Sequence, residues 1–346
     1  MTTGVRRDSR RRQATGRAAA IVHQQFGLTD EDALDLYYKM LVSRRLSEQA
    51  LRMAFQGSID VAIPADGHEA AQIASMRALR PTDPVYLFYR SAPAAYARGM
   101  TVREIFLDYL GRADGPSSGG KNLPGHWAKH DLNLMSVSGS VATQIPHAVG
   151  SALAAKLRGE DSVSVAYFGD GGSSKSDFHE GLNFAAVHQL PVIMFCENNG
   201  VAISVPFEKQ SAVARVADRA VGYAIVGISI DGADPLQVYR VMREAVDGTR
   251  AGGGPALIEA RVQRLGQHTS QVPDQRTPAQ VAADARRYDP IPRFARYLRH
   301  VGLLDEARNA ELSAHADAEI KDGVAFAEAA RLPPTARAFE NVYTSD

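Results

Sequence analysis

Apolar residues recur along the chain with two periods, and the change between them separates predicted helices from predicted strands. Residues 28–57 are predicted to form a long helix or helix pair, with Thr29 as its cap, acids in its first turn and Gly57 as its stop. Further helices are expected at 67–80, 101–111 and 234–250. Apolar runs rich in β-branched and aromatic residues predict strands at 83–90, 161–168, 190–196, 223–232 and 255–265.

The centre of the chain has the pattern of a strand–helix–strand unit. Between the second and third predicted strands, one helical face is formed by Phe178, Leu182, Ala185 and Ala186. Asp177 and Glu180 resemble a capping box at the start of that helix. Such a crossover makes its two strands parallel and is right-handed. The C-terminal third alternates helical segments with prolines. We therefore predict an α/β fold: a doubly wound, mostly parallel sheet with helices on both faces, plus a C-terminal helical layer.

Composition favours a soluble intracellular protein. The 346 residues are 45% hydrophobic, and 39 basic residues match 39 acidic ones, so no overall field attracts nucleic acid or a membrane. The one cysteine, Cys196, excludes an internal disulfide framework and fits a reducing compartment. No apolar run approaches the roughly 20 residues of a membrane helix. Trp127, within the Gly-, Pro- and Ser-rich loop at 112–133, is expected at a subunit contact.

The N-terminus differs in kind from the rest of the chain. Asp8 is the one acid among the first twenty residues, which carry the arginines Arg6, Arg7, Arg10, Arg11, Arg12 and Arg17. We predict that residues 1–24 form a disordered leader and that residues 25–346 form a single domain. The leader could be a solvated segment without a dedicated role, a targeting peptide or a nucleic-acid tail. A cytoplasmic location is favoured, with the mitochondrial matrix as the alternative.

Two polar motifs follow consecutive predicted strands. GDGG, at 169–172, ends one strand, and ENNG, at 197–200, ends the next, so Asp170 and Asn199 should share the carboxyl edge of the sheet. The dinucleotide fingerprint requires glycine where Ser174 stands, and a P-loop requires G-K-[ST], which the chain lacks here. A plain tight turn would explain the glycines but not the paired asparagines. The motifs favour a Mg²⁺-bound diphosphate.

From GDG to NN, the spacing resembles the thiamine diphosphate motif. More specifically, the chain resembles the α subunit of the E1 component of 2-oxo acid dehydrogenase complexes, through VATQIPHAVGSALAAK, FGDGGSSKSDFHEGLNFAA, FCENNGVAIS, RLGQHTS and DPIPRFARYL in that order. The likeness extends from about residue 30 to the C-terminus. GGKNLPGHWAKHDLN, followed by SVSGSVATQIPHAVG, is most similar to the branched-chain members.

The resemblance implies a role for each matching residue. Mg²⁺ would be held by the side chains of Asp170 and Asn199 and by the carbonyl of Val201. The cofactor would be contacted by Tyr89, Arg90, Gly139, Val141, Asp170, Gly171, Gly172, Asn199 and His268. Among these, Val141 would be the apolar wedge that bends the cofactor, and His268 would be the catalytic histidine that assists acyl transfer. A potassium site like that of branched-chain members would use Ser138, Thr143 and Gln144.

The resemblance also implies an activity and partners. Together with an E1 β subunit in an α₂β₂ assembly, the chain would decarboxylate a branched-chain 2-oxo acid, such as 3-methyl-2-oxobutanoate, and acylate the lipoyl group of E2. The β subunit would supply the carboxylate that activates the cofactor. Pyruvate and acetoin dehydrogenase α subunits are alternatives, and a non-catalytic homologue that keeps the fold is a different class. Thr269 stands where several relatives carry a regulatory serine. The acids that normally follow that serine are replaced by QVPDQR, so phosphoregulation is not carried over.

Overall fold

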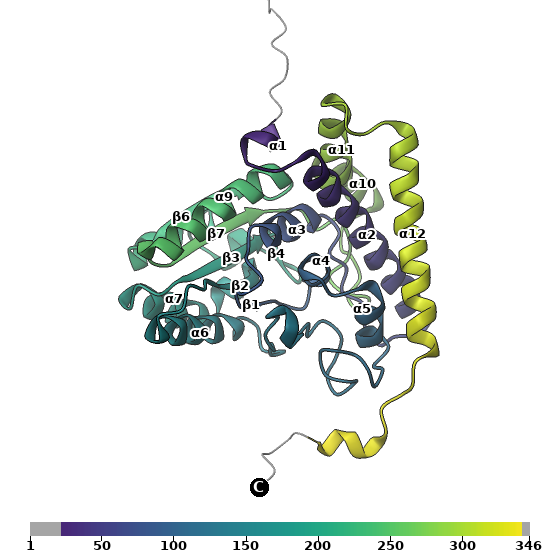
Figure 1. The fold of residues 1–346 in the computed structure, drawn as a ribbon, viewed down its shortest axis with the longest axis horizontal. Helices are drawn as coiled ribbons and strands as arrows, with labels where there is room; N and C mark the ends of the chain where they lie inside the picture. Colours follow the sequence, from purple (N-terminus) through teal and green to yellow (C-terminus); the bar gives the residue numbers. More distant parts are fainter. Residues whose placement is uncertain (1–21, 341–346) are drawn as a thin grey trace, which may run out of the picture.

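A five-stranded parallel sheet forms the centre of the molecule. The computed structural model describes residues 22–340, and the sheet has the order β1-β2-β3-β7-β6 (Figure 1). Its strands are β1 Val85–Tyr86, β2 Ser164–Gly169, β3 Val192–Asn198, β6 Val226–Asp231 and β7 Ala256–Arg261. Gly169 pairs with Glu197 at the end of β2 and β3, so the residues that follow these two strands begin side by side. The predicted parallel sheet is confirmed.

Helices cover both faces of the sheet, as a doubly wound fold requires. Along β2, Val165 and Tyr167 pack into one core, with α2 Asp30–Phe55, α3 Glu69–Arg77 and α9 Pro235–Gly248. Ala166 and Phe168 point to the opposite core, with α6 Gln144–Arg158 and α7 Ser176–Val187. Figure 1 shows α9 above the sheet and α6 and α7 below it. In such a sheet, ligands bind at the carboxyl ends of the strands.

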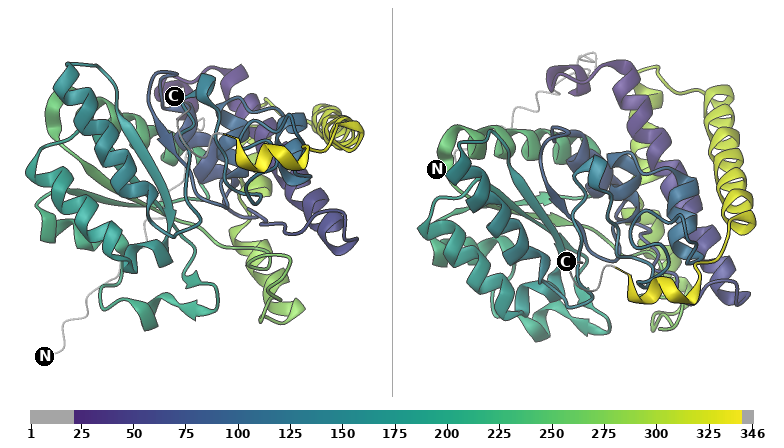
Figure 2. Two further views of the ribbon diagram at one scale, coloured as in Figure 1. Left: turned by 90° about the horizontal axis from the view of Figure 1, so that it is seen from below. Right: turned by 60° about the horizontal axis from the view of Figure 1, so that its bottom comes forward.

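The predicted C-terminal helical layer is also present. It consists of α10 Pro278–Tyr288, α11 Pro290–His300 and α12 Glu306–Ala329. Figure 2 shows α12, in yellow, along one side of the molecule, where it packs against α2 and α5 Val102–Tyr109. A Cβ on Gly323 would lie 2.6 Å from Cγ1 of Val102, so the close approach of α12 to α5 requires glycine there. Among residues 22–340 no helix has the length and apolar character needed to span a membrane.

Several elements differ from the prediction for tertiary reasons. The strand predicted at 83–90 is confined to Val85–Tyr86, because the chain then turns away and α4 Ala92–Arg98 begins, a helix that was not predicted. Thr29 caps α2 as predicted, through a capping box with Asp32. The box predicted at the start of α7 does not form, because Asp177 accepts a hydrogen bond from Thr143 Oγ1 at 3.1 Å instead.

The first described residues and the loop at 112–133 both pack against the rest of the chain. Residues 22–24, which were expected in the leader, belong to α1 Val22–Gln25, where buried His23 contacts the hydroxyl of Tyr297 at 2.7 Å. The rest of the predicted leader lies outside the described residues. Trp127 is buried edge-on against Tyr109, with ring centroids 5.4 Å apart, so it belongs to this chain's own core and not to a subunit contact.

Candidate active site

One cavity, of about 630 Å³, lies at the carboxyl edge of β2 and β3. Every site residue predicted from the sequence lines it: Tyr89, Arg90, Ser138, Gly139, Val141, Thr143, Gln144, Asp170, Gly171, Gly172, Asn199, Val201 and His268. These residues come from five separate segments of the chain. The geometry therefore brings together positions up to 179 residues apart, counted from Tyr89 to His268.

Asp170 lies at the end of β2, where the chain enters the 3₁₀ turn η2 Asp170–Ser174. Its side chain is almost fully buried, and burial raises the pKa of its carboxyl group. Gln210 donates from Nε2 to Oδ2 of Asp170 across 2.9 Å. A carboxylate buried beside a cavity, with one amide as its side-chain partner, has the chemistry of a cation ligand.

Asn199 reaches the same edge from β3. Its Oδ1 accepts the backbone N–H of Val201 at 3.2 Å, across a turn in which Gly200 has a φ of 78°. Val201 begins the small hairpin of β4 Val201–Ala202 and β5 Val205–Pro206. A carboxylate, an amide oxygen and a backbone carbonyl make a hard oxygen donor set, which fits Mg²⁺ completed by water and phosphate. The described residues hold no cluster of three or more His, Cys, Asp and Glu side chains that would suit a softer metal.

Gly171 shows why glycine follows Asp170. A Cβ there would lie 2.8 Å from Cβ of Ala202 in the hairpin, closer than carbon atoms tolerate. Gly172 is less constrained, because the nearest atoms to its added Cβ, in Phe168, lie at 3.4 Å. The turn and the hairpin thus approach closely enough to form one wall of the cavity, and a side chain at Gly171 would push them apart.

Arg90 and His268 also line the cavity. Arg90 is almost fully buried, and its guanidinium donates to the carbonyl of Pro64 at 2.6 Å and to Nδ1 of His268 at 3.0 Å. Arg264 lies 3.4 Å from the same Nδ1. Burial and these two cations lower the pKa of His268 to about 4. Since a guanidinium can only donate, Nδ1 must accept, and the neutral ring carries its proton on Nε2.

The remaining predicted residues that line the cavity differ in their contacts and in their exposure. Tyr89 contacts His268 edge-on, with centroids 5.9 Å apart. The side chain of Val141 is 46% exposed, so it is accessible to a ligand, and the next residue, Ala142, has a φ of 76°. A Cβ at Gly139 would meet Nε2 of His126 at 3.4 Å. Strained non-glycine backbone beside a cavity is typical of functional sites.

The residues predicted for potassium also lie together, but each is engaged within the chain. Ser138 Oγ accepts from the backbone of Ser140 at 3.1 Å, and Gln144 Nε2 donates to the carbonyl of Tyr167 at 2.8 Å. Thr143 donates to Asp177, as described above. Potassium binding here stays a prediction.

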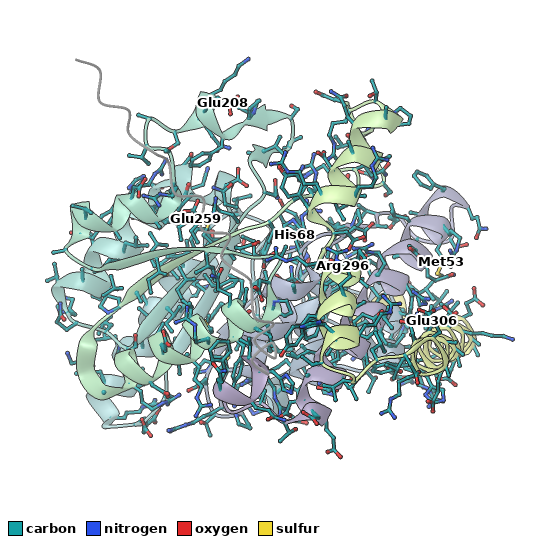
Figure 3. The ribbon with its side chains drawn as sticks, turned by 90° about the horizontal axis from the view of Figure 1, so that it is seen from above. Met53, His68, Glu208, Glu259, Arg296 and Glu306 are labelled. Atoms are coloured by element: carbon teal, nitrogen blue, oxygen red, sulfur yellow. The ribbon has the colours of Figure 1, made fainter. Side chains whose placement is uncertain are left out.

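A buried polar cluster behind Arg90 was not predicted. His68 and Glu197 are both fully buried, and Nδ1 of His68 lies 2.6 Å from Oε2 of Glu197. Gln72 donates from Nε2 to the same carboxylate at 2.8 Å and to the carbonyl of Arg90 at 3.2 Å. Figure 3 shows His68 near the centre of the molecule. The cluster fixes the turn that presents Arg90.

Another buried acid, Glu259 on β7, holds Asn198 of the ENNG motif in place. Its Oε1 accepts from Nδ2 of Asn198 at 2.6 Å and from the backbone N–H of Val216 at 3.0 Å. Figure 3 labels Glu259 within the sheet. Because Asn198 is locked by this contact, the neighbouring Asn199 is directed to the cavity. The sequence signal was a lone acid within an apolar strand.

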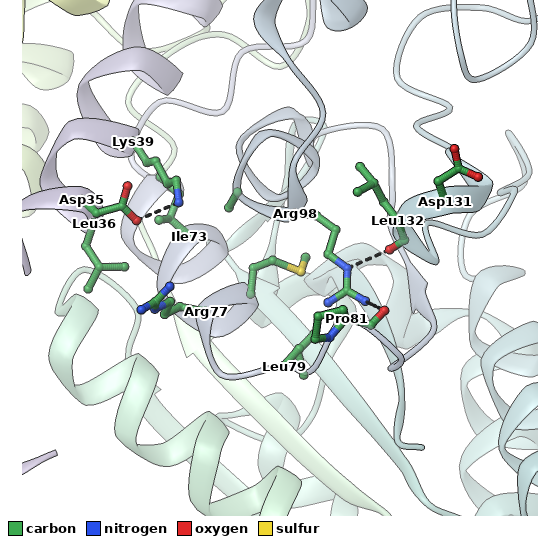
Figure 4. Close-up of a pocket in the computed structure, with 12 residues that line it drawn as sticks. Asp35, Leu36, Lys39, Ile73, Arg77, Leu79, Pro81, Arg98, Asp131 and Leu132 are labelled. Atoms are coloured by element: carbon green, nitrogen blue, oxygen red, sulfur yellow. Dashed lines mark hydrogen bonds and ion pairs between the residues drawn. The ribbon is translucent and has the colours of Figure 1, made fainter. Parts of the chain in front are cut away.

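A second cavity, of about 200 Å³, lies between α2, α3 and α4 (Figure 4). Two of its basic side chains are paired within the chain: Lys39 with Asp35 at 2.7 Å, and Arg98 with the carbonyl of Leu132 at 2.9 Å. None of the predicted site residues lines it. The cavity at the sheet edge is therefore the candidate active site.

Comparison with known proteins agrees with this geometry. The family model described as "Dehydrogenase E1 component" matches residues 37–336. The 2-oxoisovalerate dehydrogenase subunit alpha of Bacillus subtilis is 41% identical over 286 residues, which cover 82% of this chain and 87% of the relative. The 3-methyl-2-oxobutanoate dehydrogenase subunit alpha of Mycobacterium tuberculosis is 37% identical over 301 residues, 86% of this chain and 79% of the relative. The pyruvate dehydrogenase E1 component subunit alpha of Staphylococcus aureus is 35% identical over 303 residues, 87% of this chain and 79% of the relative. The chain therefore belongs to the dehydrogenase E1 component family, whose members depend on thiamine diphosphate.

Proposed function

We propose that this chain is the α subunit of a branched-chain 2-oxo acid dehydrogenase, which decarboxylates substrates such as 3-methyl-2-oxobutanoate and acylates a lipoyl group. The observation that carries the proposal is the convergence of Asp170, Asn199, Arg90 and His268 on one cavity. Of the relatives named above, the two with branched-chain names are 41% and 37% identical, against 35% for the pyruvate enzyme. That order supports the branched substrate.

In this proposal the wall formed by Asp170 and Asn199 binds Mg²⁺, with the carbonyl of Val201 as a third ligand. Thiamine diphosphate, when bound, supplies the nucleophilic carbon and the electron sink for decarboxylation. Arg90 binds its diphosphate through a planar guanidinium, and backbone N–H groups of Gly171 and Gly172 bind the same phosphates. Val141 presents its accessible side chain to the cofactor as the wedge.

His268 acts as a neutral hydrogen-bond donor. With Nδ1 facing two arginines, its Nε2–H is the atom left to donate to an oxygen of the reacting acyl group. The low pKa keeps the ring neutral across the physiological range, so the ring can hold a proton at Nε2 without adding a charge. The same ring lies edge-on to Tyr89, which limits its rotation.

The acids that line the cavity indicate that a partner subunit completes the site. Of the acids that line it, Asp170 is assigned to the metal and Asp177 is bonded to Thr143, so the carboxylate that activates the cofactor is assigned to an E1 β subunit. Exposed apolar side chains at the rim, Val141 and Ile203, fit coverage by such a subunit. We propose an α₂β₂ assembly that serves the lipoyl domain of E2 and, since the relatives named above are bacterial, a cytoplasmic location.

The test is a comparison of decarboxylation rates for the chain copurified with a β subunit, with Mg²⁺, thiamine diphosphate and an artificial electron acceptor. Preference for 3-methyl-2-oxobutanoate over pyruvate and 2-oxobutanoate, abolished in Asp170→Ala, is expected. Preference for pyruvate would keep the mechanism and overturn the substrate. No activity and no cofactor binding would indicate a non-catalytic homologue.

A further inference from the structure

Gln210 is a polar residue next to the site that the proposed function leaves without a role. It ends the short helix α8 Phe207–Gln210, which follows the β4–β5 hairpin. Its Nε2 donates to Oδ2 of Asp170 at 2.9 Å, although 40 residues separate the two in sequence. This is the one side-chain hydrogen bond to the Asp170 carboxylate formed within the described part of the chain.

The orientation of the Gln210 amide is fixed by its two neighbours. A carboxylate oxygen can only accept, so the atom facing Asp170 must be the amide nitrogen. On the other side, the hydroxyl of Ser174 lies 3.5 Å from Oε1 of Gln210 and can donate to it. Gln210 therefore holds Oδ2 of Asp170, while backbone N–H groups of Asp170 and Asn199 also interact with the carboxylate.

Helix α8 is anchored firmly enough to hold that orientation. Phe207 is buried in the core under α6 and α7, and its backbone N–H donates to the carbonyl of Gly200 at 2.9 Å. The helix is therefore tied to the residue directly after Asn199. Arg219 adds a second link, because it donates to the carbonyl of Ser173 in the η2 turn and to Oγ of Ser211 after the helix.

We propose that Gln210 is a positioning residue that sets the orientation of the Asp170 carboxylate for Mg²⁺. This inference rests on the proposed function, since it assumes that Asp170 ligates the metal. Without this donor the carboxylate would keep only its backbone hydrogen bonds, and its ionised form would lose a charge-assisted hydrogen bond from a side chain. The role of Gln210 is thus to hold Oδ2 of Asp170 by a hydrogen bond, so that the carboxylate keeps one orientation toward the ion.

The experiment measures how the binding of thiamine diphosphate depends on Mg²⁺ concentration, by titration calorimetry on the full chain copurified with a β subunit. The variant is Gln210→Met, which keeps the length of the side chain and removes the donor. The matched control is Lys209→Ala, one residue earlier on the same helix, at an exposed position without a polar side-chain contact among residues 22–340. Figure 3 shows that the preceding residue, Glu208, lies at the outer edge of the molecule. If Gln210→Met does not fold, Gln210→Asn, whose amide is too short to reach, carries the same test.

The expected result is a rise of about tenfold in the half-saturating Mg²⁺ concentration for Gln210→Met, with wild-type cofactor affinity restored at saturating Mg²⁺ and Lys209→Ala unchanged. An unchanged Mg²⁺ dependence would overturn the inference. So would a loss of binding that excess Mg²⁺ does not restore, accompanied by a lower melting temperature of the metal-free protein, because that pattern belongs to a structural role. Wild-type binding independent of Mg²⁺ would overturn the metal assignment itself, and this inference with it.

Discussion

Nη2 of Arg90 lies 3.0 Å from Nδ1 of His268, so a buried cation faces the acceptor nitrogen of the predicted catalytic ring. Burial is the largest cause that lowers the pKa of His268 to about 4, and protonation of Nδ1 would also place a positive charge against Arg90 and near Arg264. We expect the His268 ring, followed by NMR in histidine-labelled protein without cofactor, to titrate near pH 4. In Arg90→Met the midpoint should move up toward the usual value of about 6.5.

The lowered pKa of His268 also determines how the stability of the protein changes with pH. Between pH 6.5 and 4 the unfolded chain binds a proton at His268 and the native chain does not, so this residue makes the protein less stable as the pH falls through that window. In His268→Gln the free energy of unfolding should therefore decline less between pH 6.5 and 4.5 than in the wild type. A decline equal to that of the wild type would show that the ring is not held neutral.

Gly171 and Gly172 offer a matched pair of substitutions. In Gly171→Ala the new methyl group would lie 2.8 Å from Cβ of Ala202, so the hairpin that carries Val201 must move, at a cost of about 1–3 kcal/mol. In Gly172→Ala the nearest atoms, in Phe168, lie at 3.4 Å and can yield slightly. We expect Gly171→Ala to weaken thiamine diphosphate binding roughly tenfold in calorimetry, with Gly172→Ala close to the wild type. Equal effects would mean that contact with the hairpin does not matter.

The parts of the site that could be predicted are those that follow from strand order and local motif. Asp170 and Asn199 end consecutive parallel strands, and β2 and β3 are neighbours, so the crossover rule alone brings them to one edge. His268 follows β7, the next strand over, but nothing local distinguishes it from a surface histidine. Its assignment came from resemblance to the family, and the structure then placed it against Arg90.

The parts that could not be predicted depend on contacts between distant residues. His68 and Glu197 are 129 residues apart, and a single sequence carries no signal that pairs them. Asp177 had the local pattern of a helix cap but forms a tertiary hydrogen bond with Thr143, which local propensity cannot anticipate. Similarly, the apolar run at 83–90 could not reveal that β1 ends at Tyr86, where the chain turns to bring Arg90 to the cavity.

Glu197 is expected to be essential for stability. Its Oε2 accepts from Gln72 and pairs with His68, all within the core, so Glu197→Ala would leave two buried polar side chains without their partner. Removal of one member of a buried pair costs about 3–5 kcal/mol. We expect a loss of that size in urea unfolding of Glu197→Ala and a smaller loss in Glu197→Gln, which keeps an acceptor oxygen. If the two variants were equally stable, the hydrogen bonds would not be the cause.

Asp170→Asn should separate the stability of the metal-free protein from cofactor binding, because the two respond in opposite directions. Burial raises the pKa of Asp170, so the stability associated with its protonated form is present at low pH and is lost as the pH rises through the raised pKa. Above that raised pKa the buried ionised carboxylate is a net cost, which asparagine removes while it still accepts from Gln210. We expect the melting temperature of the metal-free variant to equal or exceed that of the wild type by a few degrees, roughly 2–4 °C per kcal/mol.

Addition of Mg²⁺ and thiamine diphosphate should raise the melting temperature of the wild type and leave the variant unchanged, since ligand stabilisation requires binding. An exposed control, Asp247→Asn, should behave like the wild type in both measurements. A variant that is less stable without metal would show that the carboxylate contributes to the fold itself, and a variant that is still stabilised by the ligands would remove Asp170 from the metal site.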